Sequence, residues 1–206
     1  MSTESKEITV ENYAAFSCHL LAKGITFIHP PKLPELVGLD SPALDVMTDF
    51  RYVQPVTVEP NTSIDDALEE MKSKGVRLLL VVEEEEKIIG VITSKIILGE
   101  EPIRIVEKNR IPRAEITVSM VMTPQSEVTV INLISVRNAK VGHIVATLRK
   151  LNRKHLLVID IDKTTGKQDV CGLFSTSQIG RQLGVMVVPA MPAAQTLAEI
   201  KQQLEQ

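Results

Sequence analysis

The chain contains an internal repeat, and this repeat limits the folds available to it more than any other feature. The tripeptide Val46-Met47-Thr48 returns as Val121-Met122-Thr123, 75 residues further along. An apolar stripe that begins at Ile64 returns in a second stripe that begins at Val141. Because several unlike features recur in the same order, we interpret the chain as two copies of one structural unit.

The pattern of each copy predicts a helix followed by two strands. The apolar residues of both stripes are spaced i, i+3, i+4, i+7, which is typical of one helix face. A short branched run follows each stripe, at 78–82 and at 156–159, as in buried strands. A polar turn then leads to a second strand with a central glycine, at 88–93 and at 170–175. The predicted fold class is mixed, α+β or α/β, with two β-α-β-β-α repeats and flanking helical segments.

Local signals fit this plan. Thr62, followed three residues later by Asp65, predicts a capped helix start. Glu70 and Lys74 form an i, i+4 pair, and Gly75 stands where a helix end adopts a left-handed conformation. We interpret the polar segments 83–86 and 160–169 as hairpin turns rather than as metal sites, because neighbouring carboxylates in a turn do not converge on one point.

The repeat also predicts the organisation of the chain. Helical patterns at 9–23 and 195–205 flank the repeats, and Pro30, Pro31 and Pro34 favour an extended linker. We expect four segments, namely an N-terminal helix with linker at 1–42, repeat 1 with its connecting segment at 43–115, repeat 2 at 116–184, and a tail with a helix at 185–206.

Composition narrows the class of protein. The 206 residues are 44% apolar, 24% charged and 3% aromatic, with a net charge of −3. These values favour a globular protein with an aliphatic core and disfavour a nucleic-acid binder. No apolar run is long enough for a membrane helix, and the start shows no signal peptide. We therefore expect a cytoplasmic protein in which Cys18 and Cys171 are separate buried thiols rather than a disulfide.

The ordered set of motifs resembles the cystathionine-β-synthase (CBS) domain, in the tandem arrangement called a Bateman module and in its stand-alone type. The resemblance covers about residues 43–184. In the first copy it rests on Asp45-Val46-Met47-Thr48, the strand exit 56–60, the helix 64–75, Leu80-Val81-Val82 and Gly90-Val91-Ile92-Thr93. In the second copy it rests on Met120-Val121-Met122-Thr123, the helix 141–152, Leu157-Val158-Ile159-Asp160 and Gly172-Leu173-Phe174-Ser175.

The resemblance implies a pseudo-twofold pair of three-stranded sheets, with helices on one side and the strands packed together. It implies two clefts between the repeats and a homodimer. In many members of the family the clefts bind an adenosyl ligand such as AMP, ADP, ATP or S-adenosylmethionine. The expected role is a non-catalytic, ligand-responsive regulatory or sensor module that acts on a separate, unidentified protein partner.

The resemblance also implies candidate ligand-binding residues. Hydroxyl groups follow the last strand of each repeat at Thr93 and Ser94, and at Ser175 and Thr176. These hydroxyls either cap the following helix alone or cap it and also contact a ligand phosphate, and the sequence leaves both interpretations open. The family places an aspartate for the ribose three residues after the first hydroxyl, where this chain has Ile96 and Gln178. Gln178 still offers one acceptor, whereas Ile96 offers none.

Basic residues precede the first strand of each hairpin, where the family binds phosphates. They are Arg77 in the first copy and Lys154 with His155 in the second. The second group ends the basic cluster 149–155, which is either part of a phosphate site or a solvated helix end stabilised by the helix dipole. Nucleic acid is a third interpretation, which the absence of interleaved aromatic residues disfavours.

Known catalytic and metal-binding motifs are absent from the sequence. It has no phosphate-binding loop, no dinucleotide-binding glycine pattern and no nucleophile elbow. The four histidines do not share metal-ligand spacing. We therefore expect no enzyme and no metal site. The two remaining hypotheses are a ligand-responsive regulatory module and a structural dimerisation module whose clefts are degenerate and hold no ligand.

Overall fold

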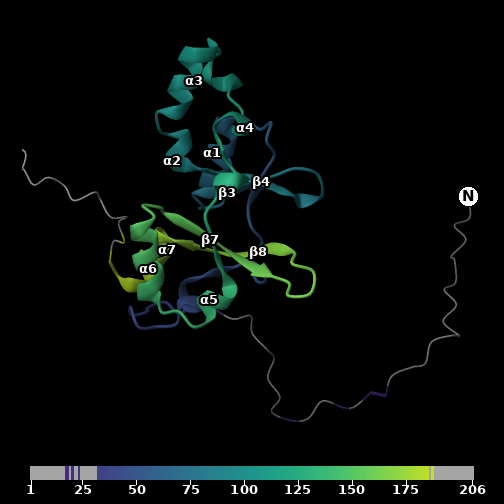
Figure 1. Ribbon diagram of the computed structural model, residues 1–206, viewed down its shortest axis with the longest axis vertical. Helices are drawn as coiled ribbons and strands as arrows, with labels where there is room; N and C mark the ends of the chain where they lie inside the picture. Colours follow the sequence, from purple (N-terminus) through teal and green to yellow (C-terminus); the bar gives the residue numbers. More distant parts are fainter. Residues whose placement is uncertain (1–16, 19, 21–22, 24–31, 186, 188–206) are drawn as a thin grey trace, which may run out of the picture. The chain divides into compact units, whose positions relative to one another are not determined.

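The computed structural model describes residues 17–18, 20, 23, 32–185 and 187 (Figure 1). The chain divides into two compact units, Met1–Pro31 and Lys32–Gln206, and both repeats belong to the second unit. The helix predicted at 9–23 falls mostly outside the described residues, and the helix predicted at 195–205 falls wholly outside them.

The mixed fold of two β-α-β-β-α repeats is confirmed. Repeat 1 consists of β2 (Thr57–Val58), α1 (Ile64–Ser73), β3 (Leu78–Val82), β4 (Ile88–Thr93) and α2 (Ser94–Ile97). Repeat 2 consists of β6 (Val130–Asn132), α6 (Val141–Lys150), β7 (His155–Ile161), β8 (Gln168–Ser175) and α7 (Thr176–Leu183). Three further helices are α3 (Glu101–Asn109) and α4 (Val118–Val121), which connect the repeats, and α5 (Leu133–Arg137), which lies between β6 and α6.

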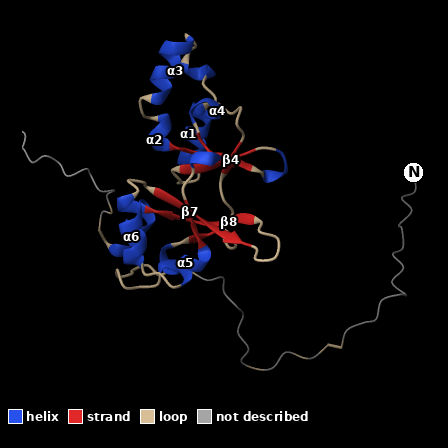
Figure 2. Cartoon of the chain, viewed as in Figure 1, coloured by secondary structure: helices blue, strands red, loops and turns tan. Residues whose placement is uncertain are grey.

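Each sheet has four strands, so the expected three-stranded sheets are wrong. With β1 at Thr48–Asp49 and β5 at Thr123–Pro124, the sheet orders are β2-β3-β4-β5 and β1-β8-β7-β6. Figure 2 colours the strands red and labels β4 of the first sheet and β7 and β8 of the second. The fourth strand of each sheet is a two-residue strand from the segment before the other repeat. β1 (Thr48–Asp49), which precedes repeat 1, pairs with β8, and β5 (Thr123–Pro124), which precedes repeat 2, pairs with β4. The two repeats are therefore joined by exchanged edge strands.

A glycine makes each exchange possible. A Cβ atom on Gly90 would lie 2.5 Å from the Thr123 carbonyl oxygen, and one on Gly172 would lie 2.9 Å from the Thr48 carbonyl oxygen. The sulfur atoms of Met122 and Met47 would be 2.9 Å and 3.0 Å away. The central glycine and the Met-Thr pair thus recur together because they contact each other across the repeats.

The packing has three layers of apolar contact. Helices cover the outer face of each sheet, and a third cluster lies between the sheets, with Leu78, Leu80 and Val91 from repeat 1 and Leu157 from repeat 2. The predicted packing through the strands is therefore confirmed. The exchange extends to the cores, since Ala43, Val46 and Met47 pack in the core of repeat 2, and Ile116, Val118 and Val121 pack in that of repeat 1. The domain boundaries at 43 and 116 stay a prediction.

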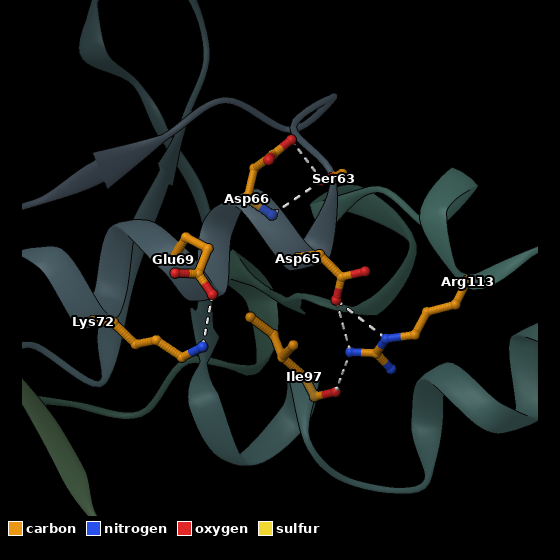
Figure 3. Close-up of polar contacts among 7 residues, drawn as sticks. All are labelled: Ser63, Asp65, Asp66, Glu69, Lys72, Ile97 and Arg113. Carbon is orange, nitrogen blue, oxygen red and sulfur yellow. Dashed lines mark hydrogen bonds and ion pairs between the residues drawn. The ribbon is translucent and has the colours of Figure 1, made fainter.

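The start of α1 differs from the sequence prediction by one residue. Ser63 caps the helix, because its Oγ accepts a hydrogen bond from the Asp66 backbone N–H at 3.1 Å and donates to the Asp66 carboxylate at 2.7 Å (Figure 3). Asp65 instead accepts a hydrogen bond from Arg113, and Arg113 also donates to the carbonyl oxygen of Ile97 (Figure 3). The predicted Thr62–Asp65 cap is wrong, because the helix begins one residue later.

The other local predictions are confirmed, apart from the length of one turn. Glu70 and Lys74 form an ion pair at 3.9 Å, and Gly75 follows α1 with φ +65°. The segment 83–86 lies in the β3–β4 connection as predicted. The predicted turn 160–169 is too long, because Asp160 pairs with Asp169 and Ile161 with Gln168 in the sheet, which leaves 162–167 as the β7–β8 connection, with Gly166 at φ +72°.

The prediction that both cysteines are buried is wrong. Cys18 is exposed rather than buried, and Cys171 on β8 is only partly buried, with burial raising the pKa of its thiol. No helix in the described part of the chain combines the length and apolarity needed to cross a bilayer.

Candidate functional site

An open groove of about 1350 Å³ lies between the two repeats. Its apolar floor includes Leu78, Val91 and Leu157, which belong to the cluster between the sheets. Repeat 1 contributes the end of α1 and residues of α2 and α3, and repeat 2 contributes the α6–β7 connection at 152–155. A molecule bound here would contact both repeats.

Five of the eight predicted ligand-binding residues line this groove. They are Arg77, Thr93, Ser94, Lys154 and His155. The other three, Ser175, Thr176 and Gln178, lie at the β8–α7 junction and are not among its lining residues. The structure thus brings the basic residues of both repeats to one groove, together with the hydroxyl groups of repeat 1 alone.

Both hydroxyl positions cap a helix, which both interpretations require. Thr93 Oγ1 accepts a hydrogen bond from the Ile96 N–H at 3.4 Å, and Ser175 Oγ accepts one from the Gln178 N–H at 3.1 Å. α2 has only four residues and α7 has eight, so a helix dipole favours an anion much less at Thr93 than at Ser175. Ligand contact by these hydroxyls stays a prediction.

A backbone link holds each basic residue beside a helix start. The Ser94 N–H donates to the Arg77 carbonyl oxygen at 3.1 Å, and the Thr176 N–H donates to the Lys154 carbonyl oxygen at 2.9 Å. The same geometry in both repeats follows from the antiparallel pairing of β3 with β4 and of β7 with β8. The positions of Arg77 and Lys154 are thus fixed by the sheets.

The groove carries uncompensated positive charge. Among the described residues, Arg77, Lys95, Arg153 and Lys154 line it without an ion-pair partner. Arg104 pairs with both Glu100 and Glu101, so one negative charge of that trio stays in excess, and Glu127 has no ion pair in the described structure. Four unpaired cations against two excess negative charges still favour an anionic ligand.

Lys95 and Arg153 were not predicted as site residues. Each is the sequence neighbour of a predicted residue, Ser94 or Lys154, and Arg153 belongs to the basic cluster recognised in the sequence. For Arg153, that cluster was the available signal. For Lys95 there was none, because its place in the groove depends on the approach of the second repeat.

His155 differs from the other basic residues because it is largely buried. Burial lowers the pKa of its imidazole to about 4, and the neighbouring charges of Lys154 and Arg77 act in the same direction. His155 is therefore neutral at pH 7, whereas Arg77 and Lys154 are charged.

The two positions expected to contact a ribose carry no carboxylate. Ile96 lines the groove with an aliphatic side chain. The Gln178 amide donates to Gln182 Oε1 at 2.9 Å and accepts from Arg181 at 2.6 Å, so both of its ends are engaged within α7. Neither position presents a free acceptor for a sugar diol.

The fold and the groove define a two-repeat α/β protein with a binding groove between the repeats. The family model described as CBS domain matches residues 43–102, the first repeat. Residues 43–102 therefore belong to the CBS-domain family, and the second repeat shares their element order and sheet pairing.

Solved structures of similar fold include other CBS pairs. An uncharacterized conserved protein from Pyrococcus horikoshii is 23% identical, with coverage of 69% of this chain and 92% of that one and a TM-score of 0.48. CBSX2, a CBS-pair protein from Arabidopsis thaliana, was solved in complex with AMP and is 24% identical, with coverage of 68% and 94% and a TM-score of 0.47.

The CBS domain pair of MJ0100, in complex with 5′-methylthioadenosine and S-adenosyl-L-methionine, is 22% identical, with coverage of 70% and 96% and a TM-score of 0.48. No curated protein matches the chain significantly. The family assignment rests on the family model and on the internal repeat, since these structural similarities are too distant to support more.

Proposed function

We propose that the chain is a ligand-responsive regulatory module that binds an anionic adenosyl ligand in the groove between its repeats. The observation that carries this proposal is the set of unpaired cations, Arg77 from repeat 1 and Arg153 with Lys154 from repeat 2, above an apolar floor. A phosphate fits the cations, and the adenine base fits the aliphatic floor. AMP, ADP and ATP therefore rank above S-adenosylmethionine, whose sulfonium is repelled.

The groove position provides a regulatory mechanism. A ligand that contacts both Arg77 and Lys154 binds best at one relative orientation, or setting, of the two repeats. It therefore shifts the population toward that setting, and a separate partner protein that distinguishes the settings responds to the ligand. We propose that this module acts in the cytoplasm as a homodimer and that it regulates a partner rather than catalyses a reaction.

Calorimetry and thermal unfolding with AMP, ADP, ATP and S-adenosylmethionine test the proposal. A ligand at 100 times its Kd stabilises the native state by about 2.7 kcal/mol, which raises the Tm. Lys154→Glu should weaken nucleotide binding by about tenfold or more, because it converts an attraction into a repulsion.

The matched control is Lys163→Glu, since Lys163 lies in the β7–β8 connection and does not line the groove. It makes the same charge change and should leave the affinity within about twofold. An equal loss of affinity in both variants would show that net charge alone matters and would contradict the groove as the site.

The second candidate function is a structural dimerisation module with ligand-free clefts. The observation that favours it is the pair Ile96 and Gln178, because neither offers a free carboxylate to a ribose. Sedimentation of the intact protein with and without the four ligands separates the two functions. A stable homodimer whose Tm no adenosyl compound raises would support the structural module and reject the regulatory one.

A further inference from the structure

His155 occupies a position where the two repeats differ in chemistry. β3 begins at Leu78, which pairs with Thr93, and β7 begins at His155, which pairs with Ser175. The two residues are thus equivalent in the repeats. Leu78 contributes an aliphatic side chain to the cluster between the sheets, whereas His155 brings a titratable ring to the groove.

The groups around His155 are mainly cationic. Lys154 precedes it on the same connection, and Arg77 approaches from repeat 1. Elsewhere in the groove, α2 contributes Lys95, the α2–α3 segment contributes Glu100 and Glu101 paired with Arg104, and the segment before β6 contributes the carboxylate of Glu127. β8 contributes the neutral hydroxyl of Ser175, which caps α7. Within the described residues, no carboxylate forms an ion pair with the ring.

The free groove therefore disfavours a proton on His155. Burial and the charges of Lys154 and Arg77 lower its pKa to about 4. A phosphate between Arg77 and Lys154 would place negative charge beside the ring and oppose the charges of those two residues, although a ligand in the groove also buries the ring further. Where the attraction outweighs the added burial, the ligand raises the proton affinity of the ring, and by reciprocity the proton raises the affinity for the ligand.

We propose that His155 couples the binding of an anionic ligand in the groove to proton uptake by its ring, so that the affinity for the ligand depends on pH. This inference rests on the proposed function, because it needs an anion in the groove. It adds pH as a second signal, which ligand binding alone does not provide.

The test measures the His155 titration directly by NMR of its ring, first in the free protein and then with saturating AMP or adenosine. AMP should raise the pKa of His155 by at least about one pH unit, so that AMP binds the protonated form about tenfold more tightly than the neutral form. Adenosine has the same base and sugar without the charge, so it adds burial but no negative charge and should not raise the pKa. His155→Gln assigns the signal.

Calorimetry at pH 5.5 in two buffers of different ionisation enthalpy gives a second measurement. AMP takes up or releases its own protons in every variant, so the difference between wild type and His155→Gln isolates the histidine. Wild type should take up more protons than His155→Gln. The control His143→Gln should behave as wild type, because His143 is exposed on α6 and does not line the groove.

The outcomes separate the two proposals. If AMP binds while the pKa of His155 stays unchanged, or if adenosine raises it equally, the proton coupling is rejected and the proposed function stands. If neither AMP nor adenosine binds, both proposals fail. A raised pKa with AMP alone, together with the lost proton uptake in His155→Gln, supports the coupling.

Discussion

The two repeats share a backbone but differ in chemistry at the junction between the last strand and the following helix. In repeat 1 the residues after the capping threonine include Lys95, and in repeat 2 the equivalent residue is Ser177. Arg77 donates a hydrogen bond to Ser177 at 3.4 Å, whereas Lys154 and Lys95 are two cations that line one groove.

This difference shows how a repeat can acquire a binding site. On one side the cation has a hydroxyl partner within the protein, whereas on the other side two like charges line the groove and favour an anion between them. Symmetric folding therefore does not require symmetric function. The three predictions that follow test where the repeats are equivalent and where they differ.

Gly90→Ala should have the largest effect and should test the exchange of edge strands. Its Cβ would lie 2.5 Å from the Thr123 carbonyl oxygen, so β5 must move away from β4. We expect a loss of about 3 kcal/mol in the free energy of unfolding. Gly172→Ala should cost less, about 1 kcal/mol, because its nearest contact is longer, at 2.9 Å from the Thr48 carbonyl oxygen.

Urea unfolding measures both losses. The control is Gly38→Ala, whose Cβ would meet only Ser41 Oγ at 4.0 Å and should change stability by less than about 0.5 kcal/mol. If Gly90→Ala were as stable as this control, the pairing of β4 with β5 would be wrong, and with it the exchange between the repeats.

The exchange also marks the limit of what the sequence could predict. The helix stripes, the apolar runs and the glycines are local patterns, so the two repeats and their element order could be predicted. Met47 and Thr48 precede repeat 1 in sequence, and nothing local indicates that they pack against Gly172. The fourth strand of each sheet was missed for this reason.

The same limit applies to the groove. Arg77, Lys154 and His155 could be predicted because each precedes an apolar strand. Lys95 was missed, because only the approach of repeat 2 makes it part of the site. The Ser63 cap was missed by one residue, since Thr62 and Ser63 are adjacent hydroxyl residues, each followed by an aspartate three positions later.

His155→Leu should have the next largest effect, on the pH dependence of the free energy of unfolding. It places in repeat 2 the residue type that Leu78 provides in repeat 1. The pKa of His155 is about 4 in the folded protein and about 6.5 when unfolded, so the unfolded state binds more protons between these values. Wild type therefore loses stability as pH falls from about 6.5 toward 4, by about 2 kcal/mol at pH 5. His155→Leu should lack this loss.

Urea unfolding of wild type and His155→Leu at pH 7.5 and at pH 5 checks this prediction. The difference between the two pH values should shrink in His155→Leu by about the 2 kcal/mol that the histidine contributes. An unchanged difference would mean that His155 titrates normally in the folded state, and the distinction between His155 and Leu78 would then lie in packing alone.

The smallest effect should come from removal of the two capping hydroxyls, Ser175 and Thr93, and it tests whether the two junctions differ. Ser175→Ala should cost about 1 kcal/mol of unfolding free energy, because it removes the 3.1 Å bond to Gln178 that starts the eight-residue α7. Thr93→Ala should cost only about 0.5 kcal/mol, since its bond to Ile96 is longer, at 3.4 Å, and α2 has four residues.

Urea unfolding measures both costs, with Ser126→Ala as the control at an exposed serine for which the structure shows no hydrogen bond. Ser175 and Thr93 should also separate in ligand binding, because Thr93 lines the groove and Ser175 does not. Thr93→Ala should therefore weaken AMP binding more than Ser175→Ala, although it destabilises the fold less. If the order were the same in both measurements, the caps would act on the ligand only through stability, and the contact of Thr93 with the ligand would be rejected.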